Sequence, residues 1–159
     1  MNIIFVKINK NFNIILISDI YIEITNTMNN KVLYDSIVKI LLYADMIKLV
    51  HLTTEKYSAH KLCDEATDAV RSYCDELSEK SFGYFGGPKF KDFNIKQDVF
   101  VTDDLGEILG HINDLLVILR KKYEDVDCLV STIDDFSGKL NQLVYLTSFD
   151  KISDYKMKN

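Results

Sequence analysis

The sequence predicts an all-α protein, a bundle of four helices with one long connection between the second and the third helix. The chain has 159 residues, with one proline, six glycines and no tryptophan. Hydrophobic residues make up 47% of it, and it is rich in Leu, Ile, Lys, Asp and Glu, which suit long helices. This composition argues against a loop-rich all-β fold, and the length suits one domain with its own core.

The net charge of −5 gives the protein no overall attraction to nucleic acid, so DNA binding would require a local basic patch or assembly. The three cysteines, Cys63, Cys74 and Cys128, are odd in number and form no CxxC pair. All three lie in periodic apolar stretches. We interpret them as reduced thiols in or near the core of an intracellular, cytoplasmic protein, without a disulfide framework.

Residues 1–27 differ from the rest of the chain because β-branched and aromatic side chains dominate them. Ile20, Ile22 and Ile24 alternate with other residues, a pattern typical of one or two strands. Charged residues interrupt the apolar runs and no small-residue cleavage site follows, so neither a signal peptide nor a membrane-spanning helix is favoured. Another interpretation is that the functional protein starts at Met28 and that the preceding segment is an appendage.

From residue 31 onward the apolar residues recur at spacings of three and four, which is typical of helices that bury one face. The first helix is predicted over residues 31–53, after the cap candidates Asn29 and Asn30. Ser58 is a good N-cap for a second helix over residues 59–82. The expected core stripe of this second helix is Leu62, Ala66, Ala69, Tyr73 and Leu77.

Glycines and a proline end the second helix and open a long, aromatic-rich connection over residues 84–100. A third helix that ends near residue 123 is expected to be capped by Thr102 or Asp103. The same apolar rhythm predicts a fourth helix over residues 127–148.

A ferritin-like bundle has two tightly joined helices, a long crossover and then two more tightly joined helices. The predicted helices follow this order. We therefore divide the chain into a β-prone or appended segment over residues 1–27, a ferritin-like four-helix bundle over 28–150 and a polar tail over 151–159. Because the same bundle serves many tasks, its function has to be inferred from a site.

Five side chains of the kinds that bind metals lie across the first two predicted helices: His51, His60, Asp64, Asp75 and Glu79. At about 100° per residue, the last four fall within a sector of about 100° on the second helix, opposite its apolar stripe. Amphipathic helices routinely carry acidic residues on a solvated face. Helical geometry alone therefore favours an ordinary exposed surface.

The segment HLTTEKYSAHKLCDEATDAVRSYCDELSEK resembles the iron-site segment of the DNA-protection-during-starvation (Dps) mini-ferritins. His51 and His60 match the two histidines of that family's pattern. Asp64, Asp75 and Glu79 follow His60 by four, fifteen and nineteen residues, which is the family's spacing. The family builds a dinuclear iron centre at a twofold interface between subunits, so the resemblance implies ligands that face away from the bundle core.

The resemblance implies a ferroxidase that oxidises ferrous iron with peroxide or dioxygen, for iron storage and oxidative protection. It also implies a homo-oligomer, either a dimer or a dodecamer. By this resemblance, His51 with Asp75 or Glu79 would hold the metal, and His60 with Asp64 would complete the site across the interface. Imidazole and carboxylate ligands suit Fe(II), which agrees with such a site.

The chain departs from the family pattern at two places. Leu52 stands where the family usually has a Trp, and the connection between His51 and His60 is shorter than usual. The chain also resembles small uncharacterised ferritin-like proteins of bacteriophages, for which no activity is implied. The alternative hypothesis is a non-catalytic ferritin-like bundle, viral or phage in origin, that acts through protein–protein contacts and keeps a degenerate metal site.

Other features favour structural roles. Classical ferritin and diiron oxygenase sites need inward Glu residues and Glu-x-x-His pairs, which this sequence lacks. We interpret His111 as a partly buried structural histidine of the third helix. A solvated loop is the favoured interpretation of the basic and aromatic stretch in the long connection, and nucleic-acid binding is the weaker one. This stretch consists of Lys89, Phe90, Lys91, Phe93 and Lys96.

Overall fold

A computed structural model describes the backbone of residues 13–156 and the side-chain surroundings of residues 30–149. Within these residues the protein is helical and contains no strand, which confirms the prediction of an all-α four-helix bundle. The four long helices are α1 (Asn13–Thr53), α2 (Tyr57–Phe85), α3 (Leu105–Lys122) and α4 (Asp127–Lys156). None of the described helices is both long and apolar enough to cross a membrane.

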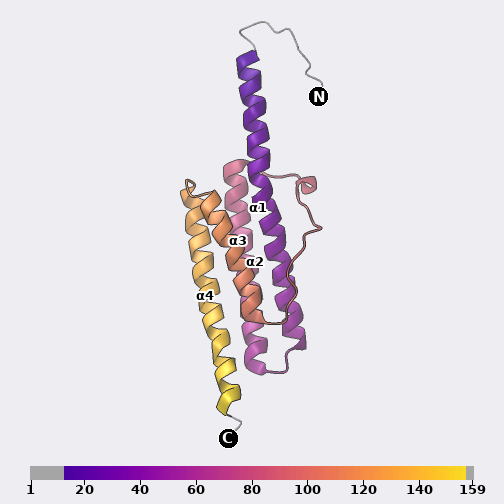
Figure 1. Cartoon of the computed structure of the whole chain (residues 1–159), viewed down its shortest axis with the longest axis vertical. Coiled ribbons are helices and arrows are strands. Elements are labelled where there is room, and N and C mark those ends of the chain that lie inside the picture. The colour runs from indigo at the N-terminus through magenta and orange to yellow at the C-terminus, as the bar shows by residue number, and fades with distance from the viewer. Residues whose placement is uncertain (1–12, 157–159) are drawn as a thin grey trace.

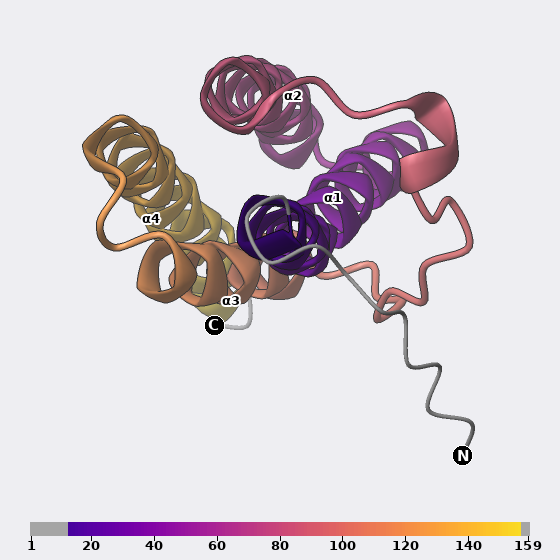
Figure 2. The same cartoon turned by 90° about the horizontal axis from the view of Figure 1, so that it is seen from above.

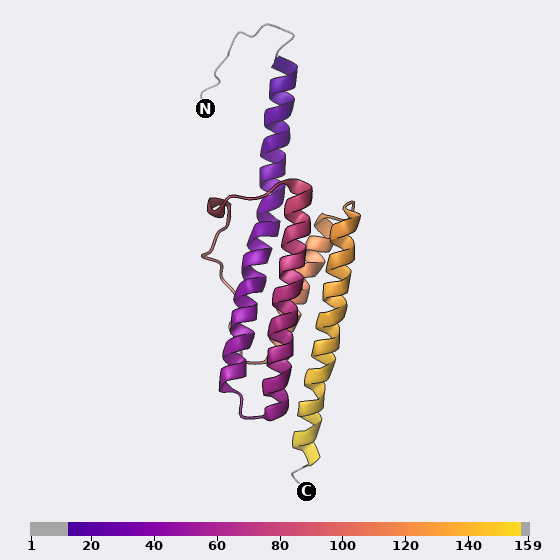
Figure 3. The same cartoon turned by 180° about the vertical axis from the view of Figure 1, so that it is seen from behind.

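The helices form a four-cornered bundle in which α1 and α4 occupy opposite corners (Figure 2). Both of these helices pack against α2 and α3. Along the chain, α1 and α4 run in one direction while α2 and α3 run in the other, so every packed pair is antiparallel (Figure 1). The first part of α1 projects beyond the ends of the other three helices (Figures 1 and 3).

Residues 86–104 connect α2 to α3 along the outside of α1, from one end of the bundle to the other (Figures 1 and 3). Gly86 opens this connection with a φ of 91°, a conformation that a residue without a Cβ adopts easily. The connection contains one 3-10 helix, η1 (Phe90–Asp92), and the ring of the next residue, Phe93, lies 5.4 Å from that of Tyr34. Phe90 itself is 82% exposed.

The predicted strands in residues 1–27 are wrong for residues 13–27, which belong to α1, while residues 1–12 lie outside the described part. Neither glycine nor proline occurs between residues 13 and 53, so nothing in the sequence ends a helix there. Asn30 is accordingly a buried residue inside α1 and not a helix cap. The alternation of isoleucines, which a helix also accommodates, was the weaker signal.

Two helix caps differ from the predicted ones. The N-cap of α2 is Lys56, two residues before the predicted Ser58. The N-cap of α3 is Asp104, and not the predicted Thr102 or Asp103. The side chain of Asp104 accepts a hydrogen bond of 3.1 Å from the backbone N–H of Glu107. The predicted caps were of the right chemical type for α3 but displaced by one or two residues along the chain.

The core stripe of α2 is rotated from the predicted one. Ala66 and Leu77 are fully buried as predicted, but Leu62, Ala69 and Tyr73 are only partly buried. The hydrophobic residues that complete the stripe, each 1% exposed or less, are Cys63, Val70 and Cys74. Sequence reasoning gave too much weight to the bulky Leu and Tyr, whereas close packing at the centre of the bundle places smaller side chains there.

The three cysteines have different surroundings. Cys63 and Cys74 are each 1% exposed, as predicted, whereas Cys128 is exposed, so its assignment to the core is wrong. Burial raises the pKa of the Cys74 thiol to about 12, and burial also raises the pKa of Cys63. Both buried thiols are therefore poor nucleophiles in the folded protein.

We expect a thiol-specific disulfide reagent at mildly alkaline pH to label one thiol per folded chain quickly, at Cys128. Cys63 and Cys74 should react only as the protein unfolds, because they are shielded and protonated. The release of the coloured thiolate, followed with and without denaturant, measures this difference. Cys128→Ser is the control, and fast labelling of that variant in its folded state would contradict the buried placement of the other two.

Candidate metal centre

The turn between α1 and α2 brings two histidines into contact. α1 ends at Thr53 and α2 begins at Tyr57, so His51 and His60 lie on antiparallel helices beside a very short connection. The centroids of the two imidazole rings are 3.7 Å apart, with the ring planes tilted by 31°. His51 is 7% exposed and His60 is partly buried.

Backbone carbonyls orient both rings. Nδ1 of His51 donates a hydrogen bond of 3.1 Å to the carbonyl oxygen of His60, and Nδ1 of His60 donates one of 3.2 Å to the carbonyl oxygen of His51. Because an oxygen of this kind only accepts, each Nδ1 carries the proton in the neutral ring. Each Nε2 then keeps its lone pair, which is the tautomer that a metal ligand needs.

Asp64 lies one turn after His60 on α2 and adds a carboxylate to the pair. Its Oδ1 is 3.1 Å from Nδ1 of His51 and accepts a hydrogen bond of 2.9 Å from Nζ of Lys48. The side chain of Asp64 is 45% exposed, so the cluster opens onto the surface of the protein. Lys48 comes from α1, one turn before His51.

The charges around Asp64 keep its carboxylate ionised. The hydrogen bond from Lys48 is the largest cause that lowers the pKa of Asp64, and attraction to His51, Lys48 and His60 lowers it further. The pKa of Asp64 is lower in the folded protein than in the unfolded chain, so ionised Asp64 stabilises the fold. This contribution is complete above the carboxyl pKa of the unfolded chain and is lost as the pH falls through the lower pKa of the folded protein. The side chain of Asp64 is therefore an anion at neutral pH.

The three side chains of this cluster lie close enough together that they could hold a metal ion. One ligand atom from each of His51, His60 and Asp64 can be chosen so that all three lie within 4.8 Å of one another. Two imidazoles and one carboxylate suit Fe(II), Zn(II) and similar divalent ions, and three protein ligands leave positions for other ligands.

The other two predicted ligands lie farther along α2. At about 1.5 Å per residue, Asp75 is about 16 Å and Glu79 about 22 Å from Asp64 along the helix axis. Both are exposed, and neither joins the three-residue cluster within the described part of one chain. Within one chain, His51 therefore lies with His60 and Asp64, and the pairing of His51 with Asp75 or Glu79 in a site between subunits stays a prediction.

His111 has the structural role that the sequence predicted. It is partly buried on α3, where its ring stacks on Tyr43 with a centroid distance of 5.9 Å and an interplanar angle of 9°. The ring of Phe100, which belongs to the long connection, also contacts His111, with a centroid distance of 4.9 Å. His111 thus fastens the connection to the bundle and stands apart from the three-residue cluster.

Sequence reasoning missed Lys48. Its position three residues before His51 places both side chains on one face of α1, and that spacing was the available signal. A lysine at a helix surface is, however, ordinary. Its importance arises only because α2 places Asp64 opposite it.

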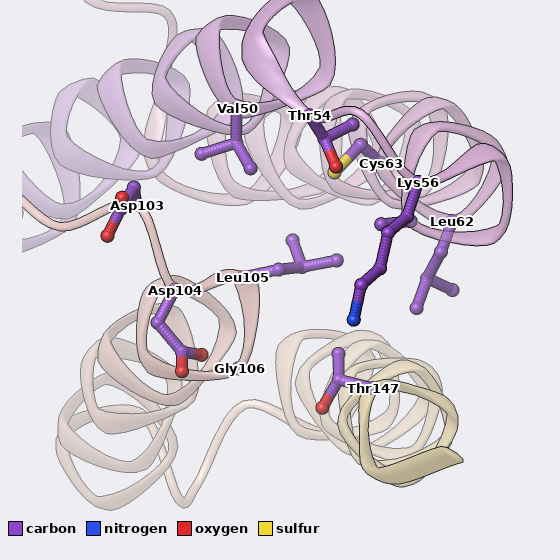
Figure 4. Close-up of a pocket in the computed structure, with 11 residues that line it drawn as sticks. Val50, Thr54, Lys56, Leu62, Cys63, Asp103, Asp104, Leu105, Gly106 and Thr147 are labelled. Carbon is purple, nitrogen blue, oxygen red and sulfur yellow. The ribbon is translucent and has the colours of Figure 1, made fainter. Parts of the chain in front are cut away.

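A separate cavity of about 290 Å³ lies at the same end of the bundle. The α1–α2 turn, the start of α3 and the last part of α4 surround it (Figure 4). Apolar side chains such as Leu62 and Leu105 line it together with the polar Lys56, Asp104 and Thr147 (Figure 4). It contains none of the three clustered ligands. The metal-type cluster and this cavity are therefore different sites.

Comparison with known proteins places the candidate ligands within a recognised family. A family model described as a family of unknown function (DUF5856) matches residues 51–146, a range that includes all five candidate ligands. No curated protein and no solved structure matches the chain.

Proposed function

The chain belongs to DUF5856, a family of unknown function, and we propose that it binds and oxidises ferrous iron at a site shared by two copies of the chain. The observation that carries the proposal is the cluster of His51, His60 and Asp64, in which one ligand atom from each side chain lies within 4.8 Å of the other two and Lys48 lowers the pKa of the carboxyl group. These ligands suit Fe(II), the substrate of the proposed reaction.

The arrangement of the helices supports the same proposal. A tight α1–α2 turn, a connection that crosses the length of the bundle and a tight α3–α4 turn correspond to a ferritin-like topology. The cluster opens at the surface of the α1–α2 pair through Asp64, whose side chain is 45% exposed, while His51 is buried. Iron bound there would be accessible from outside a single bundle.

A second copy of the chain would complete the site. Asp75 and Glu79 cannot reach the cluster of their own chain, but they lie on the same helix and could meet the cluster of a partner arranged around a twofold axis. Exposed leucines on α1, Leu49 at 63% and Leu52 at 68%, provide apolar surface beside His51 for such a contact.

Oxidation would then proceed with two ferrous ions held close together. Each ion gives one electron, and the pair reduces one molecule of peroxide with two protons to two molecules of water. The residues of the chain hold the ions: His51, His60 and Asp64 from one copy, and Asp75 and Glu79 from the other. Carboxylate oxygens also bind the ferric product, which suits iron storage.

We expect Asp75→Ala combined with Glu79→Ala to reduce the rate of ferrous iron oxidation by about tenfold or more, because the shared site loses its partner carboxylates. Absorbance of the ferric product measures the rate. The matched control is Asp114→Ala with Glu124→Ala, which removes two exposed carboxylates from α3 and the α3–α4 turn. Equal rates for the parent and the Asp75 and Glu79 variant would refute an active shared site.

The second candidate function is that of a non-catalytic bundle that acts through protein–protein contacts and retains a degenerate metal site. The ion pair between Lys48 and Asp64 favours it, because this pair satisfies the carboxylate without a metal. The size of the protein in solution separates the two candidates. A monomer in light scattering would favour the second candidate, since a monomer cannot complete a shared site.

A further inference from the structure

We propose that Lys48 is a built-in competitor for the metal: its ammonium group holds Asp64 until a divalent ion displaces it, and so sets the affinity and selectivity of the site. This inference rests on the proposed metal site and adds a residue to it. Lys48 lies outside the range that the family model matches, and it is not one of the five predicted ligands.

The position of the ammonium group supports this role. Nζ of Lys48 lies 2.9 Å from Oδ1 of Asp64, the same oxygen that lies 3.1 Å from Nδ1 of His51. A dication that binds Asp64 and the two imidazoles would stand close to this positive charge. Repulsion between them therefore requires Lys48 to leave as the metal enters.

The side chain of Lys48 has room to leave. It is 45% exposed, and its long aliphatic stem allows the ammonium group to swing into water. One turn earlier on α1, the carboxylate of Asp45 is already paired with Arg71, so water is the partner open to the displaced ammonium group. The displaced ammonium group can therefore be hydrated without a rearrangement of the bundle.

The competition has a consequence for selectivity. Mg²⁺ and similar ions bind mainly through carboxylate oxygens and gain little from the two imidazoles. Such an ion would have to displace Lys48 and would gain only one carboxylate ligand in return. Ions that bind imidazole well gain three ligands for the same displacement. Lys48 therefore excludes hard cations while it admits Fe(II) and its analogues.

We expect Lys48→Met to lower the dissociation constant for Co²⁺, an air-stable stand-in for Fe(II), by about tenfold or more, because the competing charge is gone. Lys48→Gln, a second uncharged variant, should behave in the same way. Lys48→Arg keeps the charge and should stay within about threefold of the parent. Lys121→Met, which removes an exposed lysine from α3, is the control for net charge and should not change the affinity.

Isothermal titration calorimetry of the full chain with CoCl₂, and separately with MgCl₂, measures these affinities without any turnover. Measurable Mg²⁺ binding by Lys48→Met but not by the parent would support the selectivity. If the parent and both uncharged variants bind Co²⁺ equally well, the role of Lys48 is refuted and the metal site stands. If none of them binds Co²⁺, the proposed function itself fails.

Discussion

Replacement of His60 by alanine is expected to weaken Co²⁺ binding by about 100-fold or more, the largest effect of any single change at the site. The variant would lose one of the proposed metal ligands, Nε2 of His60. It also loses the Nδ1 hydrogen bond to the carbonyl oxygen of His51 and the ring contact at 3.7 Å, which together hold the second imidazole in place. Loss of orienting contacts alone commonly costs a metal site about 10- to 100-fold in affinity.

The measurement is a calorimetric titration of the parent and the variant with CoCl₂ at neutral pH. His111→Ala is the matched control, because His111 is also a partly buried histidine that stacks on an aromatic ring, but it stands apart from the cluster. The control should bind Co²⁺ like the parent, although it will be less stable. Unchanged affinity in His60→Ala would show that the metal, if bound at all, is bound elsewhere.

Phe136→Ala is expected to lower the free energy of unfolding by about 3–5 kcal/mol, enough to remove a large share of the stability of an ordinary domain. Phe136 is fully buried on α4, and its ring stacks on Tyr73 of α2 at 5.1 Å with an interplanar angle of 10°. Truncation leaves a cavity between two helices that α1 and α3 cannot fill without shifting the backbone. Urea denaturation followed by circular dichroism should show a lower midpoint with an unchanged slope.

Phe90→Ala is the matched control for that experiment. It makes the same chemical change at a side chain that is 82% exposed, so the free energy of unfolding should change by about 0.5 kcal/mol or less. Similar losses in the two variants would mean that Phe136 is not in the core as placed. That result would also place the packing of α2 against α4 in doubt.

The helices after residue 30 were predictable because their apolar residues recur at helical spacing and glycine or short polar turns separate them. The extent of α1 was not, because a run of isoleucines satisfies both strand and helix patterns over a short window. The choice between them depends on continuity with the helix that follows. Continuity over residues 13–53 is a property of the whole segment and is not visible in the alternation of Ile20, Ile22 and Ile24.

The candidate site was predictable in part. His60 and Asp64 are four residues apart, so a helix alone places them together. The contact of His51 with His60 depends on the short turn between α1 and α2, whose shape the sequence does not specify. The pairing of Lys48 with Asp64 depends in turn on how the two helices align. The proposed use of Asp75 and Glu79 as ligands would require a second copy of the chain.

The most direct test of the proposed iron site is a crystal structure of the protein soaked anaerobically with ferrous iron, with anomalous scattering recorded at the iron edge. We expect an anomalous peak bound by Nε2 of His51, Nε2 of His60 and a carboxylate oxygen of Asp64. We also expect Lys48 to be turned away and Asp75 or Glu79 of a second copy to face the ion. Absence of a peak at these three side chains, with Lys48 still paired to Asp64, would contradict the proposed iron site.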